Sequence, residues 1–132
     1  MSSTIVVAWT PDEFGAVAVE RALEEARMRS GRLLVVNGTR GDSYVDSSFA
    51  HADQLAALEA SLAGSEISAE VRQTMGTDVA EQVLEVAEEV DATMIVLGLR
   101  RRTPVGKLLM GSVAQRVLLG AECAVLAVKP AR

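Results

Sequence analysis

The sequence predicts a single α/β domain: a doubly wound, five-stranded parallel sheet with helices on both faces. Short apolar runs typical of buried strands alternate along the chain with longer segments that have the 3.6-residue apolar period of helices. The length of 132 residues corresponds to one domain. Apolar residues make up 49% and charged residues 23%, as in ordinary folded domains. We therefore expect residues 1–132 to share one fold.

The first strand is expected at Ile5–Trp9, a continuous apolar run. A helix should follow at once, because Thr10 is a suitable N-cap, Pro11 suits the first helical position and Glu13 completes a capping box. Its apolar positions recur at helical spacing as far as Gly31, where we expect it to end.

The second strand is expected at Arg32–Asn37, whose unbroken run of leucine and valine indicates burial on both faces. Glycine, aspartate and serine then gather in Gly38–Ser48, which indicates a longer loop. A second helix is predicted over Phe49–Leu62, with Gly64 at its C′ position.

The third strand, Glu66–Gln73, alternates apolar and polar residues. One face of this strand is therefore expected to be exposed to solvent, which is normal for an edge strand and uncommon inside a parallel sheet. We place it at an edge. The remaining elements are a helix from Thr77 or Asp78 to Val90, a strand at Ala92–Leu97, a short helix ending near Leu119 and a strand at Cys123–Lys129.

Composition excludes several classes of protein. Thirteen basic and eighteen acidic residues give a net charge of −5, which repels polyanions, and the few aromatic residues cannot form a stacking platform, so no nucleic acid partner is expected. One cysteine and one histidine leave no disulfide or zinc site. The apolar runs are too short to cross a membrane and the first residues lack a secretory signal, so we expect a cytoplasmic protein.

The loop after the fourth strand is the first candidate for a binding site. Ligands of doubly wound sheets bind beyond the carboxyl ends of the strands, where the strand order reverses. Residues 98–112 include Arg100, Arg101, Arg102 and Lys107 and no acidic residue. An anion site is one interpretation, because cations and helix amides both favour phosphate. A solvated basic loop, or a partner for acidic helices, is the other.

The helix after this loop offers a second source of phosphate contacts. Gly111, Ser112 and Val113 lie where it begins, so their free amides and the serine hydroxyl can meet an anion. Alternatively, Ser112 and Gln115 form a capping box that needs no ligand. The first helix differs, because its opening turn is acidic and would repel a phosphate.

These patterns together resemble the universal stress protein family over nearly the whole chain. Five segments carry the resemblance: the strands IVVAW, LLVVN, ATMIVLG and CAVLAVKP, and the glycine loop that ends in GSVAQRVL. The resemblance implies the strand order 3-2-1-4-5 and a homodimer. It also implies that some members bind ATP through Gly-x2-Gly-x9-Gly-[Ser/Thr].

The chain matches this motif in part. Gly98 and the pair Gly111-Ser112 stand at the expected distance, whereas Arg101 occupies the second glycine position. Thr10 stands where nucleotide-binding members carry an aspartate. A side chain at position 101 restricts positive φ and close approach to a phosphate, while guanidinium groups bind phosphate bidentately and can replace amide contacts.

We therefore expect a stress-response module that binds ATP or AMP, with Mg²⁺ present only alongside ATP. By analogy with the family, Thr10 and Val36 would line the sugar and base. The phosphate contacts are expected from Gly98, Arg100, Arg101, Arg102, Gly111, Ser112 and Val113. The homodimer would form through the strand Cys123–Lys129, an apolar edge that needs cover.

Two alternatives stay open. One is a dimeric interaction protein of the same family that does not bind nucleotide, with Arg101 closing the pocket or facing an acidic partner. The other is a slow nucleotide hydrolase. No general base is identifiable beside the basic loop, so the sequence favours a binding module over an enzyme.

Overall fold

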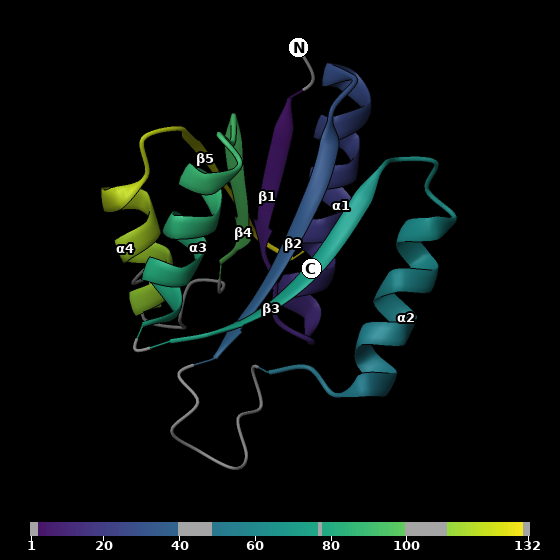
Figure 1. The fold of residues 1–132 in the computed structure, drawn as a ribbon, viewed down its shortest axis with the longest axis horizontal. Helices are drawn as coiled ribbons and strands as arrows, with labels where there is room; N and C mark the ends of the chain where they lie inside the picture. The colour runs from purple at the N-terminus through teal and green to yellow at the C-terminus, as the bar shows by residue number, and fades with distance from the viewer. Residues whose placement is uncertain (1–2, 40–48, 77, 100–110, 131–132) are drawn as a thin grey trace.

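A parallel sheet with helices on both faces forms the structure, a computed structural model that describes residues 3–39, 49–76, 78–99 and 111–130. The strand order is β3-β2-β1-β4-β5. Helices α1 and α2 cover one face, and α3 and α4 cover the other (Figure 1). The predicted fold class and strand order are both confirmed.

The elements fall close to their predicted positions. The strands are β1 (Thr4–Ala8), β2 (Arg32–Thr39), β3 (Ala69–Met75), β4 (Met94–Gly98) and β5 (Ala124–Val128). The helices are α1 (Glu13–Arg29), α2 (Ala52–Ala63), α3 (Val79–Glu89) and α4 (Ser112–Gly120). The observed boundaries differ from the predicted ones where a turn, or a contact with a residue distant in the sequence, determines where an element begins or ends. For example, Glu66 adopts a positive φ of 66°, so β3 begins later than its apolar alternation predicts.

Strand β1 lies at the centre of the sheet and divides the core into two layers. Val7 pairs with Val35 of β2 and with Val96 of β4. These side chains face α1 and α2, whereas the adjacent Val6 faces α3 and α4. Successive side chains of a strand point to opposite faces, so a fully apolar strand needs helices on both sides. This explains the continuous apolar runs in the sequence.

The two edges of the sheet differ in polarity. Strand β3 carries charged side chains, as predicted for an edge. There the Arg72 guanidinium contacts the Oε2 atoms of Glu70 at 2.6 Å and Glu89 at 2.7 Å, and these hydrogen bonds raise the pKa of Arg72. Strand β5, at the other edge, is entirely apolar. Its neighbour Cys123 packs against the core, and burial raises the pKa of the thiol.

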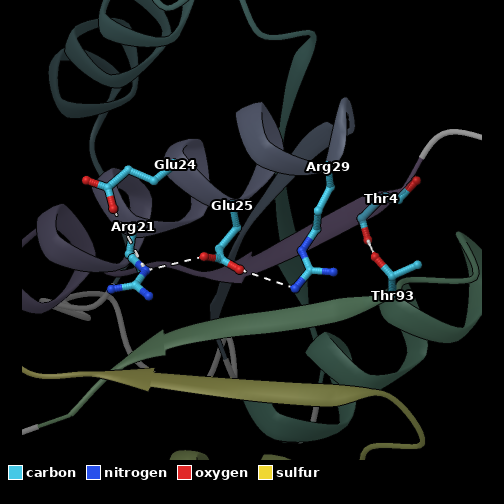
Figure 2. A network of polar contacts seen from close by, with 6 residues as sticks. All are labelled: Thr4, Arg21, Glu24, Glu25, Arg29 and Thr93. Carbon is cyan, nitrogen blue, oxygen red and sulfur yellow. Dashed lines mark hydrogen bonds and ion pairs between the residues drawn. The ribbon is translucent and has the colours of Figure 1, made fainter.

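Helix α1 contains one buried carboxylate, that of Glu25. Figure 2 shows Glu25 between two arginines of the same helix. Its oxygens lie 3.5 Å from Arg21 Nε and 3.3 Å from Arg29 Nη2, and its side chain is only 8% exposed. Both arginines keep contact with solvent, so the buried charge is balanced at little cost to them. No helix in the described ranges combines the length and apolar character needed to cross a bilayer.

Candidate functional site

A cleft of about 430 Å³ opens at the carboxyl ends of the central strands. Strand β1 lies between β2 and β4, so the strand order reverses at this point of the sheet. Doubly wound sheets bind their ligands at this position. The cleft is lined by residues that follow β1 and β4, by the end of β2, and by the first turns of α1, α3 and α4. The N-terminal turns of three helices therefore line one cavity.

Asp12 closes the N-terminus of α1. It is the N-cap, and its Oδ1 accepts hydrogen bonds from the amides of Phe14 and Gly15, both at 3.1 Å. The Thr10 hydroxyl donates to the same oxygen at 2.7 Å. The prediction that Thr10 caps this helix was therefore wrong. Thr10 instead supports the aspartate that does so.

Gly98 brings the end of β4 against the start of α1. A Cβ on Gly98 would lie 2.4 Å from the carbonyl oxygen of Phe14, closer than any real contact permits. Gly98 belongs to the strand itself and has no positive φ. The sequence placed this glycine in the loop after the fourth strand, but it ends the strand, where it allows the close approach of two backbones.

The N-terminus of α4 is open. Its N-cap is Gly111, which has no side chain to accept a hydrogen bond, and Ser112 is the first helical residue. The capping box of Ser112 with Gln115 is therefore wrong. The Gln115 amide is bonded to the Gly111 carbonyl at 3.0 Å, whereas the described residues provide no acceptor for the amides of Ser112 and Val113. Among the described residues, a Cβ on Gly111 would meet nothing within 4 Å.

Helix α4 is held by a small set of contacts. Ala114 and Val117 are buried against the core. Arg116 forms an ion pair with Asp78, the N-cap of α3, and a longer one of 3.8 Å with Glu81. These contacts fix the direction in which the open amides point.

Two buried amide side chains adjoin the lining residue Gly38, and sequence analysis missed both. Gln82 donates from Nε2 to the Thr39 carbonyl at 2.9 Å and accepts from the Thr74 hydroxyl at 2.6 Å. Asn37 donates from Nδ2 to the Trp9 carbonyl at 3.0 Å. The only sequence signal for Asn37 was a polar residue at the end of an apolar strand. The only signal for Gln82 was a polar residue on the apolar side of a helix. These bonds fix the ends of β1, β2 and β3 around Gly38, a lining residue.

The structure brings most of the predicted site residues together. Those that line the cleft are Thr10, Val36, Gly98, Gly111, Ser112 and Val113. Arg100, Arg101 and Arg102 lie outside the described residues. The prediction omitted several lining residues, namely Ala8, Trp9, Asp12, Phe14, Gly38, Val79, Val83, Leu97, Leu99 and Ala114. Most are apolar, as is usual for the walls of a small-molecule pocket.

Comparison with known proteins identifies the family. The sequence profile of the universal stress protein family matches residues 1–129. A universal stress protein of Mycolicibacterium smegmatis is 49% identical over 126 residues, covering 96% of this chain and 97% of the relative. The chain belongs to the universal stress protein family.

Solved structures of this family share the fold. A universal stress protein from Archaeoglobus fulgidus is 26% identical, with a TM-score of 0.81 and coverage of 98% of this chain and 99% of its own. A universal stress protein in complex with cAMP is 23% identical, with a TM-score of 0.74 and 98% of both chains covered. One from A. fulgidus in complex with dAMP is 21% identical, with a TM-score of 0.66 and the same coverage. Their likeness to this chain is one of fold.

Proposed function

We propose that this chain is a stress-response module that binds an adenine nucleotide, AMP or ATP, in the cleft between β1, β2 and β4. The observation that carries the proposal is the open N-terminus of α4 in that cleft. Its amides at Ser112 and Val113 lack acceptors within the described chain, and no described residue would contact a Cβ on Gly111. Such a helix start attracts phosphate through its amides and its dipole.

The rest of the cleft suits the other parts of a nucleotide. Apolar side chains of Val36, Val79 and Val83 offer a surface for a base, and Thr10 lies near the expected sugar. Two universal stress proteins of the same fold were solved with cAMP and dAMP, which supports an adenine ligand. In this proposal Arg100, Arg101 and Arg102 neutralise the phosphate charge, and Mg²⁺ accompanies ATP only. The cytoplasmic location stays a prediction.

Calorimetric titration with AMP and ATP tests the proposal. Saturable binding of either nucleotide to the wild-type protein is expected, and Arg101→Gly should weaken it if the arginine captures phosphate. Absence of heat with both nucleotides would contradict the proposal. Binding gained only in Arg101→Gly would instead favour the dimeric module whose pocket Arg101 closes. Phosphate release above a buffer blank would indicate the hydrolase.

We further propose that the protein is a homodimer through Cys123–Lys129. Among the described strands, β5 pairs only with β4, and its apolar side chains remain partly exposed. Such an edge favours pairing with a second copy. Sedimentation at micromolar concentration should give a dimer, and Ala124→Lys, at an exposed position, should shift it toward monomer. A wild-type monomer at that concentration would refute the assignment.

A further inference from the structure

A second cavity lies between α1 and α2, the two helices that cover the same face of the sheet (Figure 1). We call it the α1–α2 groove. Its volume of about 630 Å³ is within the usual range for small-molecule sites. Its floor is apolar, because the side chains of Trp9, Val19 and Leu58 line it and each residue is more than nine-tenths buried. The groove is separate from the nucleotide cleft, although Trp9 and Asp12 line both cavities.

Small side chains keep this groove open. Ala16 of α1 and Ala57 of α2 both line it, and both are exposed. Alanines on facing helices would allow close packing, so their exposure indicates that α1 and α2 leave space between them here. Helix α2 instead packs on the sheet through Leu58 and Leu62, the two residues of this helix that are buried. A ligand that covers the apolar floor would be stabilised by removing it from water.

The walls of the α1–α2 groove are negatively charged. They include the carboxylates of Asp12 and Glu20, and none of the described residues that line the groove is basic. The described residues give the Glu20 carboxylate no ion-pair or hydrogen-bond partner, whereas the adjacent Arg21 contacts Glu24 and Glu25. Glu20 is therefore available to a cation that enters the groove.

We propose that the α1–α2 groove is a binding site for a small organic cation with an apolar body, that is, a protonated amine on an aliphatic chain. The chain would lie on the floor formed by Trp9, Val19 and Leu58, and the ammonium group would pair with Glu20. An anion of the same size would meet two carboxylates and no basic group among the described lining residues. The site requires no nucleotide, so this proposal does not depend on the proposed function.

Two probes with the same octyl chain and opposite charge, octylammonium and octanoate, test the charge preference. Trp9 is the only tryptophan of the chain, so tryptophan fluorescence reports on this wall of the groove. In titrations at low salt without nucleotide, octylammonium should give a saturable change. It should bind about fivefold more tightly than octanoate, as expected for a charge interaction at an exposed carboxylate.

Three substitutions locate the bound probe. Glu20→Gln keeps the shape of the side chain and removes its charge, so the preference for octylammonium should fall to about twofold or less. Glu59→Gln makes the same change at an exposed position of α2 outside the groove and should leave the preference unchanged. Ala57→Phe should fill the groove from an exposed position and abolish binding of octylammonium. The thermal unfolding midpoint of each variant serves as the control for folding.

No saturable change with octylammonium would overturn this proposal, and so would equal binding of octanoate. Undiminished binding to a folded Ala57→Phe protein would also overturn it, because the probe would then lie elsewhere, for example in the nucleotide cleft that Trp9 also lines. If Ala57→Phe does not fold, the comparison of Glu20→Gln with Glu59→Gln decides: equal preferences in these two variants would contradict the site. None of these results bears on AMP or ATP binding, which is titrated separately.

Discussion

Helices α1 and α4 begin at the same cleft, yet their first turns are built differently. The start of α1 is closed by its own Asp12 and packed against the backbone of Gly98. The start of α4 has a glycine N-cap, and no other described residue lies where its Cβ would be. The comparison teaches that a helix start becomes available to an anion when the sequence provides neither a cap nor a packing partner.

The first turns of α1 and α4 also differ in charge. The first turn of α1 contains Glu13, whereas the first turn of α4 has no acidic residue. An acid in the first turn compensates the positive end of the helix dipole from within the protein. In α4 no acidic side chain of the first turn compensates the helix dipole. The cleft therefore has an acceptor end and a donor end, and this polarity would orient a bound ligand.

The two glycines at the cleft should respond very differently to a side chain. Gly98→Ala should lower the free energy of unfolding by about 3 kcal/mol, because its Cβ would overlap a backbone carbonyl that cannot move freely. Gly111→Ser should change stability by only a few tenths of a kcal/mol, since no described residue would contact its Cβ and serine is a good N-cap. Urea unfolding of both variants measures the difference. Comparable losses would show that the start of α4 is packed as tightly as that of α1.

Removing the cap of α1 should have the next largest effect. Asp12→Ala leaves the amides of Phe14 and Gly15 without their acceptor and should cost about 1 kcal/mol of stability. Asp12→Asn should stay within a few tenths of the wild type, because it retains a cap. Chemical denaturation of the two variants provides the comparison. An unchanged Asp12→Ala protein would mean that the cap does not stabilise α1.

The ion pair that holds α4 should contribute least. Arg116→Ala should cost less than about 1 kcal/mol, because Arg116 is half exposed and such pairs are screened by salt. The loss should shrink further at high ionic strength. Thermal unfolding of wild type and variant at low and high salt measures it. A large loss that is independent of salt would indicate that α4 depends on Arg116 for packing, through its aliphatic stem.

Much of the fold could be predicted from the sequence, because buried parallel strands and amphipathic helices each leave a local pattern. The leucine and valine run of β2 and the alternation in β3 placed a central strand and an edge correctly. The end of β2 was missed, because Thr39 is tied down by Gln82, a residue far along the chain. Local sequence patterns do not reveal hydrogen-bond partners that are far apart in the sequence.

The site was predicted less completely, for physical reasons that particular residues illustrate. Gly98 and Gly111 drew attention by their spacing, and the six described residues of the prediction share one cleft. The cap of α1 was misassigned because Thr10 and Asp12 are both good N-cap residues, and tertiary packing decides between them.

The most direct test gives α4 the cap that α1 already has. Gly111→Asp places a carboxylate at an N-cap that has extended backbone and no contact with another described residue at its Cβ. There it can accept hydrogen bonds from the amides that we assign to phosphate. AMP titration of wild type, Gly111→Asp and the uncharged control Gly111→Asn measures the consequence. The account predicts a fully folded Gly111→Asp protein that no longer binds AMP, with Gly111→Asn weakened less. Undiminished AMP binding by Gly111→Asp would contradict it.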